Sequence, residues 1–371
     1  MSKTLQDYAT LINDTIQSNE INHYITTDNM CQNLGGIDTF KNINIPQGKV
    51  RSFQKDDVLL SNIRLYFRKV YRAKQKGGCS SDVLVFRAKH IDSATLFAIL
   101  SSQIFTDYAC SGSQGSKMPR GNKTHMMDFK IPTINFTIAK IFNSIQNKIE
   151  NNHKINELLH KILELLYEQY FVRFDFLDEN NKPYQTSGGK MKFSKELNRL
   201  IPNDFEVKTL GELTQLKVGN KNANHSSNQG KYPFFTCSNN PLRCETYQFE
   251  GKHIIISGNG NFYVTHYDGK FDAYQRTYVV NPNNPNHYVL IYLFVKSYTN
   301  YLRLQSRGSI IKFITKSDIE NIKIVLPNLK TYAKWNNVLR MIENNNQSTQ
   351  TLTALRDFLL PLLLKQQVKP Q

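Results

Sequence analysis

The sequence predicts a mixed α/β (α+β) protein in which one domain followed by one long helix occurs twice. Three observations support this fold class. Residues 134–171 contain no glycine or proline and repeat apolar side chains with a heptad period. The same period returns near the C-terminus, and each helical segment follows a stretch of short strand-like runs and turn residues. The expected order is a first domain at 1–133, a long helix at 134–171, a connector at 172–203, a second domain at 204–327 and a second long helix at 328–371.

The two long helices are expected to pack lengthwise on one another. Asn152 ends KIENN and Asn345 ends MIENN, 193 residues later, and both occupy the same heptad position. A polar residue at such a position fixes the register of the pair. Pro361 should end or kink the second helix. The predicted seam consists of Ile138, Ile145, Asn152, Leu159, Ile162, Leu166, Val338, Asn345, Leu352, Leu355 and Leu359.

The two domains repeat one order of elements at nearly the same offset. The first is expected to contain a helix at 5–16, strands at 57–63, 66–71 and 82–86, and a helix at 94–108. The second is expected to contain strands at 233–236, 253–257 and 277–280 and a helix at 289–301. A Gly-Ser pair follows the helix in each, at 115–116 and 308–309. Chance similarity of two amphipathic helices is the alternative, but the shared order and phase favour an internal duplication.

Charge favours an anionic partner. The net charge is +17 and the isoelectric point is near 9.5. The first domain carries +6, the long helix 0, the connector +2, the second domain +5 and the C-terminal helix +4. Because the excess lies mainly on both globular segments, a nucleic-acid face on each domain is favoured over a polybasic arm.

The cysteines argue against a metal centre and against disulfides. The five cysteines are odd in number and form no CxxC pair, so neither a zinc site nor a disulfide framework is expected. The N-terminus is polar and no apolar run is long enough to span a membrane. A cytoplasmic location is therefore expected.

A search for enzyme motifs predicts no catalytic residues and no cofactor bound by this chain. The glycine-rich stretch at 115–124 has the wrong spacing for a phosphate loop, and Gly258-Asn-Gly260 lacks a third glycine and a following helix. Glu206 and Lys208 resemble part of a metal-nuclease motif, but their neighbouring carboxylate lies on the same strand, which favours a solvated strand edge.

With no catalytic motif found, the polar and basic clusters are better explained as DNA-binding residues. Asn, Gln and Arg match the donors and acceptors on base edges, and Lys and glycine-rich backbone suit phosphates. Any one such residue could equally be a turn residue or a solvated charge, but they cluster in both domains. The candidate DNA-binding residues are Ser61, Asn62, Arg64, Tyr66, Arg68, Lys69, Lys117 and Arg120 in the first domain, and Lys217, Asn220, Lys221, Asn259, Asn261, Tyr263, Tyr274, Gln275, Arg276 and Arg307 in the second.

Several segments of the sequence resemble the DNA-specificity subunit of type I restriction-modification systems. The matching stretches are YITTDNM (24–30), DDVLLSNIR (56–64), GGCSSDVLVF (77–86), GGKM (188–191), IPNDFEV (201–207) followed by LG (210–211), DGKFDAYQR (268–276) and LRDFLLP (355–361). They cover essentially the whole chain in the family's order. The usual opening phrase of a recognition domain, present at 201–211, is not recognisable near the N-terminus, so the first domain is expected to begin differently.

The resemblance implies two target-recognition domains, each reading half of a bipartite double-stranded DNA sequence, separated by two antiparallel coiled-coil helices with pseudo-two-fold symmetry. It also implies two methyltransferase subunits and restriction subunits as partners, which would bind AdoMet, ATP and Mg. A 38-residue helix spans about 57 Å, so helix length is expected to set the gap between half-sites. The alternatives are a decoy or scaffold that binds modification subunits without reading DNA, and an unrecognised DNA-modifying enzyme.

Overall fold

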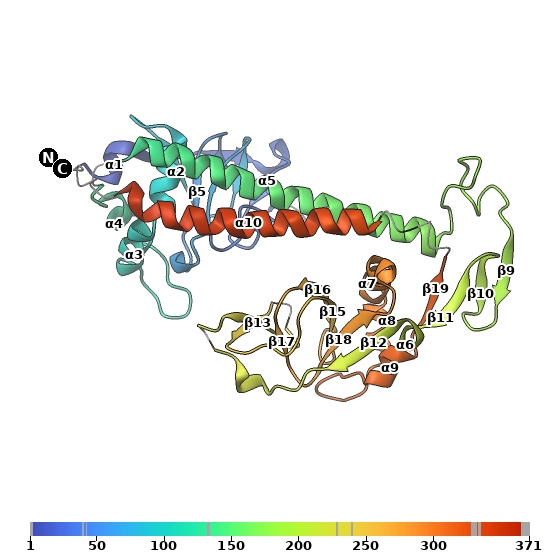
Figure 1. Cartoon of the computed structure of the whole chain (residues 1–371). Helices are drawn as coiled ribbons and strands as arrows, with labels where there is room; N and C mark the ends of the chain where they lie inside the picture. Colours follow the sequence, from blue (N-terminus) through green and yellow to red (C-terminus); the bar gives the residue numbers. More distant parts are fainter. Residues whose placement is uncertain are drawn as a thin grey trace. The chain divides into compact units, whose positions relative to one another are not determined.

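The chain folds into two compact units. A computed structural model describes residues 3–38, 41, 43–131, 134–227, 229–238, 240–327, 332 and 335–364. Unit 1 comprises Met1–Ile155 and Asn344–Gln371, and unit 2 comprises Asn156–Glu343. Both divisions fall inside long helices, so each unit contains one α/β domain and a stretch of each helix (Figure 1).

Unit 1 contains two four-stranded sheets. One has the strand order β1-β8-β5-β6 and is antiparallel, and the other has the order β2-β4-β7-β3 with β3 parallel to β7. The elements are α1 (Leu5–Tyr8), β1 (Ala9–Ile12), β2 (Thr15–Gln17), η1 (Ser18–Glu20), β3 (Tyr24–Ile25), β4 (Lys49–Phe53), β5 (Val58–Ser61), η2 (Leu65–Phe67), β6 (Val70–Arg72), β7 (Gly77–Cys79), β8 (Val83–Ala88), α2 (Ser93–Ser101), α3 (Gln103–Ser111) and α4 (Lys123–Met127).

Unit 2 contains a four-stranded sheet, a three-stranded sheet and two strand pairs. Its four-stranded sheet has the order β12-β18-β15-β16, and the smaller sheet has the order β14-β13-β17. The elements are β9 (Met191–Ser194), β10 (Arg199–Pro202), β11 (Glu206–Thr209), α6 (Leu210–Leu213), β12 (Thr214–Val218), η4 (Ala223–His225), β13 (Tyr232–Phe235), β14 (Leu242–Cys244), β15 (Lys252–Ser257), β16 (Val264–Asp268), β17 (Asp272–Ala273), β18 (Thr277–Pro282), η5 (Pro285–His287), α7 (Tyr288–Ser297), α8 (Thr299–Gln305), α9 (Lys316–Glu320) and β19 (Lys323–Leu326).

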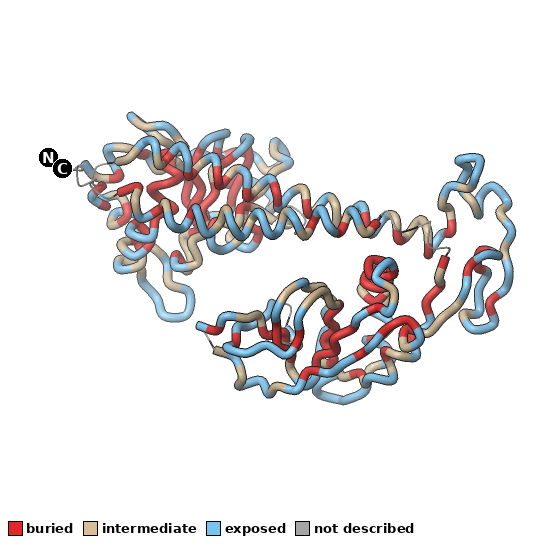
Figure 2. The backbone as a smooth tube through the Cα atoms, in the orientation of Figure 1, coloured by how far each residue is buried: buried red, intermediate tan, exposed pale blue. Residues whose placement is uncertain are grey.

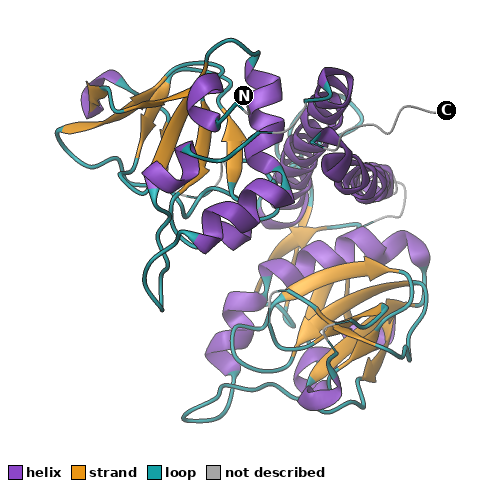
Figure 3. Cartoon of the chain, turned by 90° about the vertical axis from the view of Figure 1, so that its left-hand side faces the viewer, coloured by secondary structure: helices purple, strands orange, loops and turns teal. Residues whose placement is uncertain are grey.

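The largest apolar cluster of each unit lies between helices and one four-stranded sheet (Figures 2 and 3). This sheet is β1-β8-β5-β6 in unit 1 and β12-β18-β15-β16 in unit 2. In unit 1, α2 is buried almost all round and packs on β5, β6 and β8, and Phe142 of the long helix joins the same cluster. In unit 2, α7 is buried in the same way, with Leu163 and Ile342 of the long helices. Helices this apolar cannot face water, so both sheets are covered on one side.

The globular domains of the two units each contain a capped helical turn before the first strand of the four-stranded sheet, contrary to the expectation that the first domain begins differently. Thr4 and Asp7 form a capping box at the start of α1, and Thr209 and Glu212 form one at the start of α6. A single helical turn then leads into the edge strand of each sheet. The helix expected at 5–16 is therefore wrong: after one capped turn the chain continues as β1 and β2, where β-branched residues favour strands.

Both expected domain helices are interrupted. Helix 94–108 divides at Ser102, whose hydroxyl accepts a hydrogen bond from the Phe105 amide and thereby begins α3. Helix 289–301 divides at Tyr298 into α7 and α8. The expected connector is also folded, because β9 and β10 form a hairpin and Phe174 and Ile201 are buried in the core of unit 2.

The long helices are α5 (Phe136–Tyr167), which continues as the π-helical turn η3 (Glu168–Val172), and α10 (Trp335–Leu363). Pro361 lies in the last turn of α10. Of the expected second helix, residues 328–331, 333–334 and 365–371 lie outside the described part of the chain. No helix in the described residues is both long enough and apolar enough to cross a membrane.

Polar contacts show that α5 and α10 are antiparallel. In unit 1, the Asn152 side chain donates to the Thr349 hydroxyl (3.2 Å), and Arg356 donates to the Gln146 side chain (3.3 Å). In unit 2, the Asn156 side chain donates to the Ile342 carbonyl (3.3 Å). As the residue number on α5 increases from 146 to 156, the residue number of its partner on α10 decreases from 356 to 342. The two helices therefore run in opposite directions.

The buried face of each helix is displaced by one residue from the predicted seam. Ile162 and Leu355 are 45% and 46% exposed and do not belong to it, although Ile145 and Asn152 are buried. Each helix also packs on a globular core, and polar Gln146 and Arg356 occupy buried positions that an apolar pattern excludes. Predicted seam positions followed by a more buried residue include Ile138 (Ala139), Ile145 (Gln146), Ile162 (Leu163), Leu166 (Tyr167), Val338 (Leu339), Leu355 (Arg356) and Leu359 (Leu360).

The other predicted seam residues are half-buried. Leu159, Leu166 and Val338 pack against the core of unit 2, and Ile138 packs against that of unit 1. Asn345, Leu352 and Leu359 have intermediate exposure.

Candidate nucleic-acid interface

Three loops of unit 1 meet beyond the end of β5. The Asn62 amide donates to the Asp82 carbonyl (2.8 Å), the Gly121 amide to the Asn62 carbonyl (3.1 Å), and the Arg64 amide to the Pro119 carbonyl (2.9 Å). The loop between α3 and α4 is closed by two hydrogen bonds between Gln114 and Arg120. We call this surface rim 1, and it consists of residues 61–64, 82 and 114–121.

Unit 2 builds the same arrangement from equivalent backbone groups. The Gly258 amide donates to the Arg276 carbonyl (2.7 Å), the Ile314 amide to the Gly258 carbonyl (3.0 Å), and the Gly260 amide to the Lys312 carbonyl (2.8 Å). Arg307 and Phe313 exchange two hydrogen bonds, as Gln114 and Arg120 do. We call this surface rim 2, and it consists of residues 257–260, 276 and 307–314.

Even one side-chain contact recurs in both rims. The Ser61 hydroxyl donates to the Ile63 carbonyl (3.1 Å), and the Ser257 hydroxyl donates to the Asn259 carbonyl (2.9 Å). Both serines are buried, so Ser61 holds its loop and does not face solvent. This corrects its prediction as a DNA contact.

The two rims carry different side chains on this shared backbone. Rim 1 has Asn62, Asp82, Gln114 and Arg120 at the hydrogen-bonding positions where rim 2 has Gly258, Arg276, Arg307 and Phe313. Gly258 is required at its position because an added Cβ would lie 2.5 Å from the Arg276 carbonyl oxygen. The backbone frame is thus retained while the exposed chemistry changes.

Each rim exposes a guanidinium that is held in an ion pair. Arg120 lies 2.9 Å from Asp82 in rim 1, and Arg307 lies 3.1 Å from Asp318 beside rim 2. The arginine side chains are 61% and 62% exposed. Exposed pairs of this kind contribute about 0–1 kcal/mol, so either guanidinium could exchange its carboxylate for a phosphate or a base edge.

Two predicted cations of unit 1 point inward. Arg68 donates to the Ser101 carbonyl (2.9 Å), and the Lys69 ammonium donates to the Thr27 carbonyl. Burial lowers the pKa of both side chains. Both side chains hydrogen-bond to loops within unit 1, so they are weaker candidates for DNA contact than the exposed cations. Tyr66, between these two residues and Arg64, is 53% exposed.

The Arg64 side chain also braces a loop. Its guanidinium donates to the Lys117 carbonyl (3.3 Å), while the Lys117 side chain is exposed. Arg64 has a left-handed backbone conformation (φ 50°), which turns the chain from β5 into η2. Lys117 and Arg120 are therefore the accessible cations of rim 1.

The remaining candidates of unit 2 adjoin rim 2. The Gln275 amide donates to the Lys221 carbonyl (2.9 Å), and the Gly219 amide donates to the Thr277 carbonyl (3.0 Å). These bonds place the loop after β12 beside residues 274–276. The residues brought to this side are Lys217, Asn220, Lys221, Tyr274, Gln275 and Arg276, of which Lys217, Asn220, Gln275 and Arg276 are exposed. Asn261 donates to the Tyr263 hydroxyl (3.0 Å) in the loop that follows Gly260.

Comparison with known proteins finds similarity to DNA specificity subunits. Residues 202–355 match the type I restriction modification DNA specificity domain. The EcoDI specificity subunit, a type I restriction enzyme component from Escherichia coli, is 38% identical over 132 residues, 34% of this chain. The MjaIX specificity subunit from Methanocaldococcus jannaschii is 24% identical over 301 residues, which are 72% of this chain and 67% of that protein. Residues 202–355 are thus similar to a DNA specificity domain, and the relatives that the chain matches are type I specificity subunits.

The fold is also similar to that of a solved structure. A crystal structure of a type I restriction-modification S subunit from M. genitalium superposes with a TM-score of 0.63 at 16% identity, covering 99% of this chain and 96% of that one. The match to the E. coli specificity subunit covers only 28% of that protein.

Sequence reasoning missed three apolar residues in and beside rim 2. Leu304, Ile310 and Ile311 are 83%, 94% and 62% exposed, beside Arg307 and Lys312. The Gly-Ser pair at 308–309 predicts a loop here, but apolar residues in a sequence indicate a core. Only the structure shows these three side chains facing solvent.

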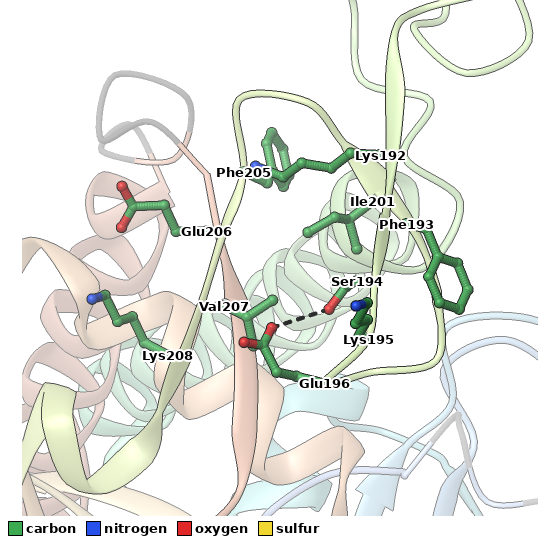
Figure 4. Close-up of a pocket in the computed structure, with 10 residues that line it drawn as sticks. All are labelled: Lys192, Phe193, Ser194, Lys195, Glu196, Ile201, Phe205, Glu206, Val207 and Lys208. Atoms are coloured by element: carbon green, nitrogen blue, oxygen red, sulfur yellow. Dashed lines mark hydrogen bonds between the residues drawn. The ribbon is translucent and has the colours of Figure 1, made fainter.

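A separate groove lies between the β9–β10 hairpin and β11 of unit 2 (Figure 4). Its lining includes Lys192, Lys195 and Lys208 together with Glu196 and Glu206, and Ser194 donates to Glu196 (3.3 Å). None of the predicted DNA-binding residues lines it. Its mixed charge makes it a poor phosphate site, so the rims remain the better candidates for a nucleic-acid interface.

Proposed function

We propose that this chain reads a bipartite double-stranded DNA sequence for a type I restriction-modification complex, with one half-site read by each rim. The observation that carries the proposal is a shared backbone frame with different exposed side chains. A conserved frame presents both surfaces to DNA in the same manner, and the side chains decide which bases fit. Two half-sites of different sequence follow from this.

The tandem arrangement supports the proposal. The two four-stranded sheets have equivalent strand orders, and the same loop hydrogen bonds recur in both rims. Two such target-recognition domains, on antiparallel coiled-coil helices related by a pseudo-two-fold axis, would match the opposite directions of two DNA strands. Helices α5 and α10 then act as the spacer between half-sites.

The same two helices are proposed to dock two methyltransferase (modification) subunits. Ile162 and Leu165 of α5 are 45% and 55% exposed, and Leu355 and Phe358 of α10 are 46% and 68% exposed. The second pair lies 193 residues after the first, at equivalent positions of the repeat. An apolar pair exposed at equivalent positions in each unit suits two copies of one partner.

Catalysis is proposed to reside on the partners. Modification subunits would supply AdoMet for adenine-N6 methylation, and restriction subunits would supply ATP- and Mg-dependent translocation and cleavage. This chain would contribute recognition and assembly. A cytoplasmic location, where DNA and these partners meet, belongs to the same proposal.

The test is methylation of DNA by the chain alone and by the chain with its modification subunit. We expect transfer of methyl groups from AdoMet only when both are present, and only to DNA that contains the target. Methylation by the chain alone would show an enzyme instead. Assembly with the partner without sequence-dependent DNA binding would show a decoy or scaffold.

A further inference from the structure

Three side chains with metal-binding atoms meet in the small sheet of unit 2. His225 ends η4, Cys244 ends β14 and Asp272 begins β17. Their ligand atoms all lie within 4.8 Å of one another, and His225 Nε2 is 3.5 Å from Asp272 Oδ2. Because the three residues are far apart in sequence, no CxxC-type spacing announces them.

The Asp272 carboxylate is fully buried, and the His225 Nε2 atom that faces it also lies 2.9 Å from the Thr246 hydroxyl. The Thr246 hydroxyl donates to the carboxylate (2.8 Å), and the Ala273 amide donates to its other oxygen (3.2 Å). Among the residues that the structure describes, no lysine or arginine forms an ion pair with it, and His225 is its one ion-pair partner. A buried carboxylate requires a positive charge, so this position favours a cation.

Cys244 is poised to respond to such a cation. Its thiol donates to the Thr246 carbonyl (3.1 Å), and burial, with the nearby Asp272 carboxylate, raises its pKa. A divalent ion binds the thiolate, and its charge would offset both anionic groups at once.

The donor set selects the metal. One imidazole nitrogen, one sulfur and one carboxylate oxygen suit zinc, whereas magnesium and calcium prefer oxygen donors. Zinc bonds of about 2.0–2.3 Å place tetrahedral donors roughly 3.5 Å apart, which is the distance observed between His225 and Asp272. His225 is partly exposed, which leaves room for water as a fourth ligand.

We propose that His225, Cys244 and Asp272 bind one zinc ion that links η4, β14 and β17. The apolar cluster of this sheet contains only six buried residues, Phe235, Phe249, Ile255, Phe271, Ala273 and Val279. A metal link therefore adds substantially to its stability. Tyr274 and Gln275, which closely follow Asp272, pair with Lys221. An ion bound at Asp272 would therefore also order this part of unit 2.

The test is titration of the full chain, purified with chelator, with cobalt(II) as a spectroscopic substitute for zinc. We expect one equivalent to bind with a thiolate-to-cobalt charge-transfer band, and zinc to displace it. Cys244→Ser should abolish the band and weaken zinc binding more than about 100-fold, since even outer-shell changes at metal sites cost 10–100-fold. Cys237→Ser, which alters a neighbouring cysteine outside the cluster, should leave both unchanged.

Zinc, but not magnesium, should also raise the unfolding temperature of the wild-type chain, and His225→Gln should reduce that effect. The proposal is overturned if the wild-type chain shows no charge-transfer band, or if Cys244→Ser retains it. It is also overturned if chelator and zinc give the same unfolding temperature, because His225 and Asp272 would then form an ordinary ion pair. The wild-type results decide the question even if a variant does not fold.

Discussion

At the residue scale, some of the predicted DNA-binding cations hold loops of the fold, whereas others face solvent. Arg68 and Lys69 are adjacent basic residues, which a sequence presents as a charged surface. Both instead donate to carbonyls inside unit 1. Arg276 and Arg307 of rim 2 are exposed. Composition could predict a basic face on each unit, but the direction of each side chain depends on loops that composition does not specify.

Arg276 tests the assignment of rim 2. We expect Arg276→Ala to relax sequence preference in one half-site by about 1–3 kcal/mol at the base it contacts, and to leave the other half-site unchanged. If Arg276 instead contacts phosphate, binding should weaken uniformly and the salt slope should fall by about one. Binding of the assembled complex to libraries varied in each half-site measures both.

A matched control is Arg199→Ala, which removes an exposed arginine from the β9–β10 hairpin of unit 2. It should change neither half-site. Equal loss of preference in both half-sites with Arg276→Ala would contradict the assignment of one half-site to each rim.

At the element scale, the duplication was predictable because it rests on repeated local patterns. Heptads, strand-like runs and Gly-Ser pairs recur at one offset, and the strand orders of the two sheets agree with that repeat. The phase of the helix seam was not predictable. Gln146 and Arg356 are polar and therefore indicate surface positions in a sequence, yet they bond to each other in the interior of unit 1.

Two residues that the heptad pattern wrongly placed in the seam belong to the exposed apolar pairs. Ile162 and Leu355 fit an apolar heptad, but their exposure on α5 and α10 indicates a face for other proteins. We expect Ile162→Asp with Leu165→Asp to reduce bound modification subunits from two to one, because buried charge opposes docking. Leu355→Asp with Phe358→Asp should do the same, and all four together should abolish binding. Native mass spectrometry of the complex counts the subunits.

The control for added charge is Lys161→Asp, which changes an exposed residue beside Ile162 and should retain two modification subunits. Loss of both subunits through one pair, or retention of both after all four changes, would contradict two equivalent docking sites.

At the scale of the whole molecule, α5 and α10 run through both units, and we propose that they set the gap between the half-sites. Removing residues 150–153 and 348–351 deletes about one turn from each helix, including both partners of the contact between Asn152 and Thr349. Each helix shortens by about 6 Å, or about two base pairs. We expect the gap between half-sites to shrink by that amount with the half-sites themselves unchanged.

The matched control removes residues 150–153 alone. This shifts α5 against α10 and should lower the unfolding temperature of the complex, because polar partners lose their register. An unchanged gap after the double deletion, or altered half-site bases, would contradict the role of these helices as the spacer.

We propose that this chain alone determines which two-part DNA sequence its partners modify. The most direct measurement is a genome-wide map of methylated adenines in cells that express this chain with its modification subunit and otherwise lack methylation. We predict one motif with two specific parts separated by a gap of fixed length, absent when either protein is omitted. A continuous motif, or methylation that does not depend on this chain, would contradict the account.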